Sequence, residues 1–405
     1  MIKELYIKRE KQITANIINN KINKISRKDK TNNSIRYYDG NNIGFYSFLG
    51  EDKKEYYERA RNNLRKNIKY KEEITKNRVR KNCIAYEYNE EDFINKAKEF
   101  IFELNEKFPD FIFSNNIKMY SSKYELRNDL NTNLYDEDLY YLLTILIKHR
   151  KSINIFDSGF VDISREFNLR DSINKISKIL IGFKNKVDLP KESKISIIFN
   201  NDSFNSKLIQ WLNPKNIAAG NSNLKNKEGK QIFKNKFNVT INRTKENFDI
   251  PFFDLEGSII ENDKFYLIEN GIFRQAFADK TTSNKYSIEN TAAAFGEYND
   301  LPNIDKVQID FEKTADSLEK LLGNERAIYV DMCQGGAYTE KGDYSTPIQS
   351  AYLYENGEIK GRLPEFSVYN NIYDMFGEDF IGVCKANEFG GYKNLVMKMN
   401  IARSN

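Results

Sequence analysis

The sequence predicts an α+β protein, with N-terminal α/β units followed by a large, β-rich C-terminal domain that holds a few helices. Two observations lead to this prediction. Before residue 190, runs with apolar residues at helical spacing alternate with runs typical of strands. After it, short runs of branched and aromatic residues are twice joined by Asn-Gly, the pair that tight β-hairpin turns favour. We expect three units, residues 1–80, 81–190 and 191–405.

The first unit is expected to hold a hairpin and a helix. Residues 34–40 and 41–48 are strand-like runs around an Asp-Gly turn. Residues 51–66 follow, with their apolar positions on one helical stripe. The basic run 66–81 also contains acidic residues. We interpret it as a solvated face or a linker and not as a nucleic-acid patch.

The second unit is expected to alternate helices and strands. Asn89 fits the cap of one helix, and Asp171 or Ser172 fits the cap of another, because their side chains can accept from free N–H groups of the first turn. Residues 111–126 alternate as strands do. Residues 136–147 form an apolar run that fits either a helix or a strand.

The third unit is expected to begin with a buried strand, followed by a helix, a hairpin, a second helix, a strand and a second hairpin. These elements cover residues 194–199, 204–212, 264–277, 314–322, 327–332 and 351–363. Asp202 or Ser203 should cap the first helix, and Thr314 the second. The hairpin turns are Asn270-Gly271 and Asn356-Gly357. Residues 278–290 are polar and should lie at a surface or a cleft mouth.

The composition argues against several classes of function and of site. Lys and Arg number 63 and Asp and Glu 58, so a formal charge of +5 over 405 residues is no argument for nucleic-acid binding. The three cysteines are far apart and form no CxxC pair, which argues against disulfides and thiolate zinc sites. The N-terminus has no signal-peptide core, and the longest apolar run is too short to span a membrane. We expect a cytoplasmic protein.

His149 is the only histidine of the chain. A metal site with two histidines is therefore impossible within one chain. Three cations flank His149 at the end of an apolar run. We interpret it as a histidine at the C-terminal end of a helix, where a cation complements the helix dipole.

Asp254 and Glu256 are candidate chemical groups in an acidic turn closed by Gly257. Paired carboxylates can act as general acid and base, or bind magnesium, calcium or manganese. The alternative is a structural turn in which the carboxylates accept from backbone N–H groups, and the residue types favour this alternative.

Several segments occur in a familiar order: Ile35-Arg36 to Phe45, Phe253-Asp254-Leu255-Glu256-Gly257, the hairpin 267–277 with Asn290, Leu301-Pro302-Asn303, Gly342-Asp343-Tyr344-Ser345, and Tyr354 to Ile359. On these segments the chain resembles the TldD/PmbA family, often described as modulators of DNA gyrase and also as a two-subunit metalloprotease. The resemblance covers nearly the whole chain.

The resemblance implies two kinds of subunit. A TldD-type subunit carries His-Glu-x-x-x-His on a helix and a later Cys, which together hold zinc. Counted back from Gly220, the corresponding positions are Asn205, Ser206 and Gln210, and none can replace its counterpart because Asn and Gln are poor zinc ligands and Ser is no general base. The Cys position falls at residues 390–392, Gly-Gly-Tyr. We therefore expect no metal and no cofactor in this chain, and zinc in the partner subunit.

The chain is thus expected to be a PmbA-type, non-catalytic subunit. It would form a heterodimer with a zinc-bearing TldD-type subunit and enclose an extended peptide in a cavity. Arg274 and Asn290 are the candidate peptide contacts. One alternative is a homodimeric module that binds a peptide or a protein and has lost proteolysis. A minor one is a gyrase- or nucleic-acid-associated factor, which the weak net charge disfavours.

Overall fold

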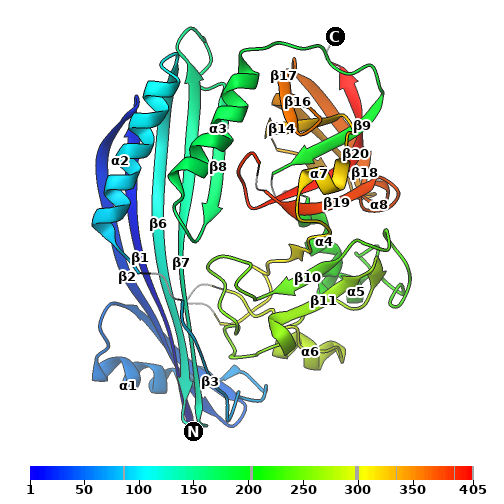
Figure 1. Cartoon of the computed structure of the whole chain (residues 1–405). Coiled ribbons are helices and arrows are strands. Elements are labelled where there is room, and N and C mark those ends of the chain that lie inside the picture. Colours follow the sequence, from blue (N-terminus) through cyan, green and yellow to red (C-terminus); the bar gives the residue numbers. More distant parts are fainter. Residues whose placement is uncertain (85–86, 201–203, 297–300, 334, 387, 404–405) are drawn as a thin grey trace.

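The structure is a computed structural model that describes residues 1–84, 87–200, 204–296, 301–333, 335–386 and 388–403. Long N-terminal strands stand on one side of the molecule, and a β-rich C-terminal half packs beside them (Figure 1). This confirms the predicted α+β class with a β-rich C-terminal part. Among the described helices, none is long and apolar enough to cross a membrane.

The N-terminal half is built on one sheet with strand order β4-β3-β2-β1-β6-β7-β5, in which β8 also pairs with β7. Four strands are 17 to 19 residues long, against about five or six in most proteins. The pairing of β2 with β3 confirms the first predicted hairpin. The strands are β1 (Ile2–Ile18), β2 (Lys21–Asp39), β3 (Asn42–Leu49), β4 (Ile68–Lys69), β5 (Val79–Asn82), β6 (Phe111–Asn128), β7 (Thr132–His149) and β8 (Ser158–Ser164).

The two faces of this sheet have different partners, because successive side chains of a strand point to opposite faces. On β1, Leu5 and Ile7 pack in a cluster with α1, and Ile13 packs in a cluster with α2. Tyr6 points the other way and packs against residues 252–255 of the C-terminal half. The helices therefore cover one face, and the C-terminal half covers part of the other.

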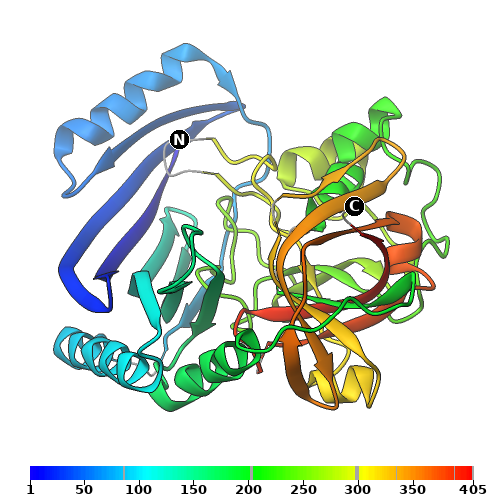
Figure 2. The ribbon, with the colours of Figure 1, turned by 90° about the horizontal axis from the view of Figure 1, so that it is seen from above.

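Three helices belong to this half: α1 (Lys54–Asn62), which a 3-10 turn extends to Lys66, α2 (Glu90–Lys107) and α3 (Leu169–Phe183). Seen from above, α2 and α3 lie side by side along the sheet (Figure 2). The side chain of Asn89 caps α2 as predicted, accepting from Asp92 N at 3.0 Å. The cap of α3 is Asn168 and not Asp171 or Ser172, because the extended backbone of Asn168 lets its side chain reach Asp171 N.

The apolar run 136–147 lies within β7. His149 is the last residue of this strand, so its interpretation as a helix-terminal histidine is wrong. The reason is that β6 and β8 pair with both edges of this part of β7, so the apolar run is a central strand of the sheet. The imidazole packs against Phe111, with 5.2 Å between ring centroids.

The C-terminal half has two sheets. One has the order β12-β11-β10-β13, and the other has the order β14-β9-β20-β18-β16-β15, with β17 on β16 and β19 on β20. A further pairing of β14 with β16 closes the second sheet into a ring. The strands are β9 (Lys194–Phe199), β10 (Val239–Asn242), β11 (Lys264–Glu269), β12 (Ile272–Phe273), β13 (Asp310–Phe311), β14 (Ala327–Cys333), β15 (Ala337–Tyr338), β16 (Asp343–Glu355), β17 (Glu358–Arg362), β18 (Phe366–Asn371), β19 (Phe380–Lys385) and β20 (Lys393–Arg403).

Both predicted Asn-Gly hairpins are confirmed, as β11–β12 and β16–β17. The helices are α4 (Asn205–Leu212), α5 (Pro214–Ala219), α6 (Lys280–Tyr286), α7 (Leu318–Leu322) and α8 (Ile372–Phe376), and a 3-10 turn covers Glu261–Asp263. Ser317 caps α7 in place of Thr314. The hydroxyl of Thr314 instead hydrogen-bonds to the backbone N–H and carbonyl of Val383 in β19. The predicted caps Asp202 and Ser203 lie outside the described residues.

The predicted boundary at residue 80 falls within β5, and β1 pairs along its length with β6. One sheet therefore contains strands from both of the first two predicted units. The division into 1–80, 81–190 and 191–405 stays a prediction.

Candidate functional site

A polar cavity of about 320 Å³ lies beside α4. Asn205 and Ile209, one helical turn apart on α4, form part of its wall. α4 is anchored because Leu208, Trp211 and Leu212 are buried in the C-terminal core. We call this space the motif cavity, because Asn205 is the first of the three positions that the sequence resemblance predicts to correspond to a zinc motif.

The motif cavity is lined by amide and phenol groups on one hand and by aliphatic side chains, Ile209, Ile250, Val307 and Ile309, on the other. Tyr392 reaches it from the loop before β20, and its hydroxyl donates to Asn247 Oδ1 at 2.6 Å. The carboxylate among its lining residues, Asp310, accepts from Lys393 Nζ at 2.5 Å and from Asn242 Nδ2 at 2.8 Å. Asn205 of α4 and Tyr392 of the loop before β20 thus line one cavity.

Ser206 and Gln210 do not line the motif cavity. Both are exposed on the side of α4 that faces solvent in the single chain. A helix turns 100° per residue, so Ser206 and Gln210 point away from the face shared by Asn205 and Ile209. The three predicted positions are therefore neighbours on one helix but do not converge.

These residues do not fit zinc. Zinc takes imidazole, thiolate or carboxylate ligands, whereas the wall of the motif cavity offers amides and a carboxylate that is already paired. Among the described residues, no three His, Cys, Asp or Glu side chains are grouped to hold a metal ion. Cys384 is buried in β19, and burial raises the pKa of its thiol to about 12. We derive no step through a metal in this chain.

A second cleft, of about 460 Å³, lies between the two halves and shares Tyr392 with the motif cavity. Lys175 of α3 lies in its wall with its Nζ 3.1 Å from Asp162 of β8. Burial raises the pKa of Asp162 to about 6, although the Lys175 ammonium opposes this shift. Phe248 and Tyr392 stand edge to face in the same wall, with ring centroids 5.6 Å apart.

Asp254 organises the acidic turn. It is 2% exposed, its Oδ1 accepts from the N–H groups of Glu256 and Ser258, and its Oδ2 accepts from Ala294 N. Burial raises the pKa of this carboxyl, and Arg243 and the backbone donors oppose the shift. This is the structural alternative considered for the pair, in which the carboxylate holds backbone N–H groups.

Glu256 joins three segments. Its carboxylate accepts from the hydroxyl of Tyr70 at 2.9 Å and from the backbone N–H of Lys280 at 2.8 Å. Burial raises the pKa of Glu256, and the nearby Asp254 and Asp279 raise it further. Its partners tie the connection before β5 to the N-terminus of α6.

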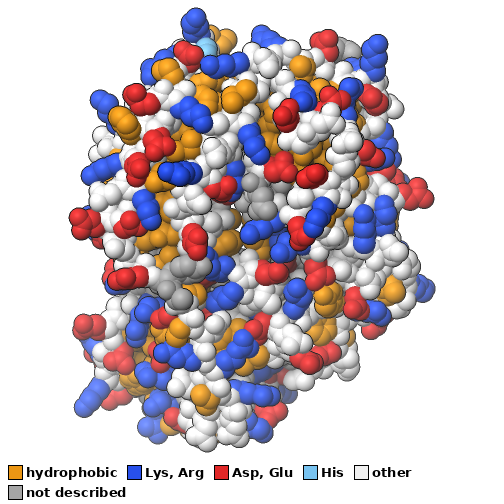
Figure 3. All heavy atoms as spheres, in the orientation of Figure 1, with side chains coloured by type: hydrophobic (Ala, Val, Ile, Leu, Met, Phe, Trp, Pro, Cys, Tyr) orange, Lys and Arg blue, Asp and Glu red, His pale blue; other side chains and the backbone are white. Residues whose placement is uncertain are grey.

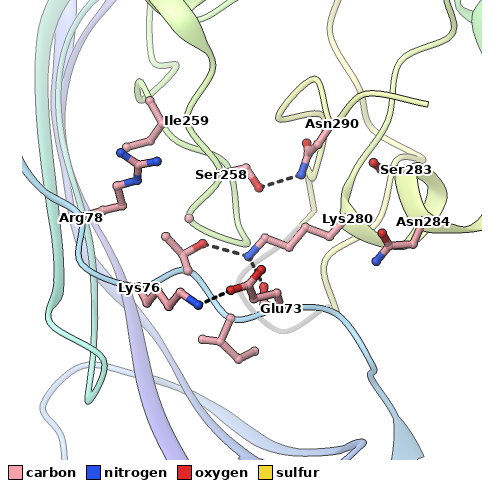
Figure 4. A pocket seen from close by; sticks show the side chains of 12 residues that line it. Glu73, Lys76, Arg78, Ser258, Ile259, Lys280, Ser283, Asn284 and Asn290 are labelled. Carbon is pink, nitrogen blue, oxygen red and sulfur yellow. Dashed lines mark hydrogen bonds and ion pairs between the residues drawn. The ribbon is translucent and has the colours of Figure 1, made fainter. Parts of the chain in front are cut away.

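Next to this turn lies a polar cleft of about 440 Å³, shown in Figure 4. Lys280 extends across it and donates to Thr75 Oγ1 at 2.8 Å and to the backbone of Glu73. Asn290 stands on the C-terminal wall and donates to Ser258 Oγ at 3.1 Å. The polar segment 278–290 therefore lines a cleft, as the sequence indicated.

Arg274 does not line this cleft. It follows β12, and its guanidinium pairs with Glu269 across the hairpin, with 2.8 Å between Nη2 and Oε2. Its side chain is 45% exposed. The two predicted peptide contacts, Arg274 and Asn290, are thus not brought together in one cleft.

The sequence analysis did not identify the residues that hold the acidic turn and the neighbouring segments in place. Arg243 is 2% exposed and donates to the carbonyls of Pro251, Phe253 and Ala292. Tyr70 and Thr75, in the run interpreted as a solvated face or linker, contact Glu256. A signal was present, because Tyr70 and Thr75 interrupt a run that is otherwise mostly charged or amide.

Comparison with known proteins shows to which class of protein the chain belongs. Residues 192–399 match the model of the PmbA/TldA metallopeptidase C-terminal domain. The β-rich half of the molecule is therefore a domain of a metallopeptidase-related class. Because this match spans about half of the chain, the chain belongs to the TldD/PmbA family.

Solved structures share the fold over nearly the whole chain. TldE from Thermococcus kodakarensis has a TM-score of 0.78 at 19% identity, and covers 99% of this chain and 96% of its own. A protein from Thermotoga maritima, proposed to modulate DNA gyrase, has a TM-score of 0.77 at 17% identity, with the same coverage. One from Bacteroides thetaiotaomicron has a TM-score of 0.68 at 17% identity, covering 100% of this chain and 94% of its own.

One curated relative is an uncharacterized protein of Methanocaldococcus jannaschii. It is 25% identical over 179 residues, which cover 44% of this chain and 42% of that protein. The aligned part thus spans less than half of the relative's length.

Proposed function

We propose that this chain is a PmbA-type, non-catalytic subunit of a zinc metalloprotease complex of the TldD/PmbA type. Its TldD-type partner supplies the zinc, and the two subunits enclose a cavity in which an unfolded or small peptide is cut. In this proposal the chain forms part of the wall of the cavity and supplies no catalytic residue.

The observation that carries the proposal is the lining of the motif cavity. On the correspondence that the resemblance implies, Asn205 stands at the position of a zinc-binding histidine and Tyr392 in the segment of the family's cysteine. Both residues line one cavity. Side-chain amides both donate and accept hydrogen bonds, as the backbone of an extended peptide does. A wall of amides and aliphatic side chains suits the holding of a peptide, whereas it is poorly suited to holding zinc.

Asn290 is proposed as a second peptide contact. It lies in the polar cleft beside Ser258 and Lys280. Arg274 is retained as a weaker candidate, because its exposed pair with Glu269 leaves the guanidinium near the surface.

The test is reconstitution. The chain is co-expressed with the product of a reading frame from the same genome that encodes His-Glu-x-x-x-His, and cleavage of unfolded casein is measured with and without this chain. We expect co-purification, zinc in the partner alone, and at least a tenfold gain in cleavage. Stoichiometric zinc in the isolated chain would contradict the assignment of the subunits.

A point variant tests the wall of the motif cavity. Asn205→Arg places a long cation in the cavity and should lower cleavage by the complex at least fivefold without releasing the partner. Ala219→Arg, on the exposed end of α5, is the matched control and should have no effect. If the chain binds unfolded casein alone and neither binds nor activates the partner, the homodimeric binding module replaces the proposal.

A further inference from the structure

The polar cleft beside the acidic turn carries more positive than negative charge. The described residues that line it include three cations, Lys76, Arg78 and Lys280, and one acid, Glu73. Lys76 and Glu73 pair with each other, with 2.6 Å between Nζ and Oε1. The charges of the other two cations are thus left over. Arg78 reaches the cleft from the N-terminal half of the chain and Lys280 from α6 (Figure 4).

The guanidinium of Arg78 is exposed and has neither a hydrogen bond nor an ion pair with any described residue. Arg80, two positions further along the chain, shows the contrast, because its guanidinium binds both carboxylate oxygens of Asp263. A guanidinium presents its N–H groups as a planar fork that matches two oxygens of a carboxylate or a phosphate. The fork of Arg78 is therefore free to bind an oxyanion from another molecule.

Lys280 supplies the cleft with charge. Its ammonium donates to the hydroxyl of Thr75 and to the backbone carbonyls of Glu73 and Glu256, which are neutral oxygens. The ammonium is thus fixed across the cleft without an ion pair to a described carboxylate. Burial raises the pKa of Glu256, whose side chain accepts from the backbone N–H of Lys280, so this carboxyl balances the ammonium less near neutral pH.

Uncharged side chains add hydrogen-bond donors to the same cleft. Asn290 donates one N–H of its amide to Ser258 Oγ at 3.1 Å, so the second N–H and the hydroxyl proton of Ser258 stay available. Asn284 is directed elsewhere, because its amide donates to Glu72. The volume of about 440 Å³ exceeds that of one carboxylate or phosphate group, so the anionic group is expected to belong to a larger molecule.

A nucleic acid is a poor fit for this molecule. On the face that Figure 3 shows, Lys and Arg side chains alternate with Asp and Glu, and no broad basic surface extends over it. A phosphate backbone is bound through many cationic contacts along a stripe or patch. A local pair of cations with amide and hydroxyl donors instead suits a single anionic group on a peptide.

We propose that the polar cleft is an oxyanion site that binds a carboxylate of a peptide. The fork of Arg78 binds the two oxygens, and Ser258 and Asn290 add hydrogen bonds. Lys280 adds positive charge. That the carboxylate comes from a peptide rests on the proposed function, in which Asn290 contacts the substrate. The chain is then selective for acidic peptides over neutral ones.

The test is binding of labelled peptides to the isolated chain, followed by fluorescence anisotropy at low ionic strength. Two peptides are compared that differ only because the glutamates of one are glutamines in the other. We expect the acidic peptide to bind at least tenfold more tightly, and Arg78→Gln to remove this preference. Arg170→Gln, at another exposed arginine without an ion pair among the described residues, changes the net charge equally and should leave the preference intact. Urea midpoints verify that both variants fold like the wild type.

Equal binding of the two peptides, or an Arg78→Gln chain that keeps the preference, overturns the proposal. Inorganic phosphate that binds through Arg78 while the two peptides bind alike also overturns it, in favour of a free anion. Binding of single-stranded DNA that Arg78→Gln abolishes overturns it in favour of a nucleic acid. The measurement needs no zinc-bearing partner. Failure of this site is therefore distinguishable from failure of the proposed subunit role, which the reconstitution reports.

Discussion

The turn at Asp254 and the loop at Asp157 are both held by a buried aspartate, but their apolar side chains lie in different surroundings. Each is closed by a buried aspartate that accepts three hydrogen bonds. Around Asp254 the apolar neighbours Phe252 and Phe253 point into the N-terminal sheet. Around Asp157 the apolar neighbours point into solvent. A carboxylate fixes the backbone, but what packs against the turn decides whether its side chains become core or surface.

The largest expected effect comes from Asp254→Ala. The change leaves three backbone N–H groups without an acceptor in a buried site, and each such group costs about 1–3 kcal/mol. We expect the free energy of unfolding in urea to fall by about 3 kcal/mol or more. Asp254→Asn, which keeps an acceptor oxygen, should cost about half as much. Equal losses for Asp305→Ala, at an exposed position, would show that the measurement does not report this turn.

Asp157→Ala should cost less, about 1–2 kcal/mol, because one backbone N–H and two side-chain donors at a surface loop can turn to water. Its clearer effect is local. Trypsin should cut after Arg150 or Lys151 at least tenfold faster than in the wild type. If proteolysis is unchanged, the loop is not held by its aspartate, and the comparison with Asp254 fails.

Asp331 is a third aspartate to compare, because it is partly buried and accepts from the hydroxyl of Ser350 at 2.9 Å. Burial raises its pKa from 3.8 to about 7. The folded chain thus binds a proton between pH 4 and 7 that the unfolded chain releases, so stability falls as the pH rises through this range. Asp331→Asn should reduce that fall by about 1–2 kcal/mol, measured as urea midpoints at pH 4.5 and pH 7.5. If the pH dependence of the Asp331→Asn variant is unchanged, the fall in stability comes from other carboxyl groups.

Arg274→Ala should have the smallest effect. Its pair with Glu269 is exposed, and such pairs contribute about 0.5 kcal/mol or less. We expect an unfolding free energy within that margin of the wild type. A larger loss would mean that the guanidinium has a structural contact beyond this pair.

Local signals in the sequence predicted much of the fold. The helix that Asn89 caps and both Asn-Gly hairpins were found, because caps and turn residues act over a few residues. The predicted cap of α3 is three or four residues too late, and that of α7 is three residues too early, since several capping side chains stand close together there. The strand character of residues 136–147 depends on β6 and β8, which no local pattern reveals.

The candidate site was less predictable. The family resemblance led to Asn205 and to the segment of Tyr392, and the structure brings these two together. The separation of Ser206 and Gln210 from the cavity depends on which face of α4 packs inward. The role of Arg243 depends on carbonyls from residues up to 49 positions away. Contacts of that range are fixed by the assembled chain and not by any short motif.

Residues 21–30, at the start of β2, form an open edge of the N-terminal sheet. β3 pairs with β2 only from Asn32 onward, so among the described strands residues 21–30 have one neighbour, β1, on one side. An open edge of this kind invites a strand from another molecule. Its side chains include five cations, Lys21, Lys24, Arg27, Lys28 and Lys30, and a single acid, Asp29. Two such edges repel each other, so the lysine-rich composition protects this long sheet from aggregating edge to edge.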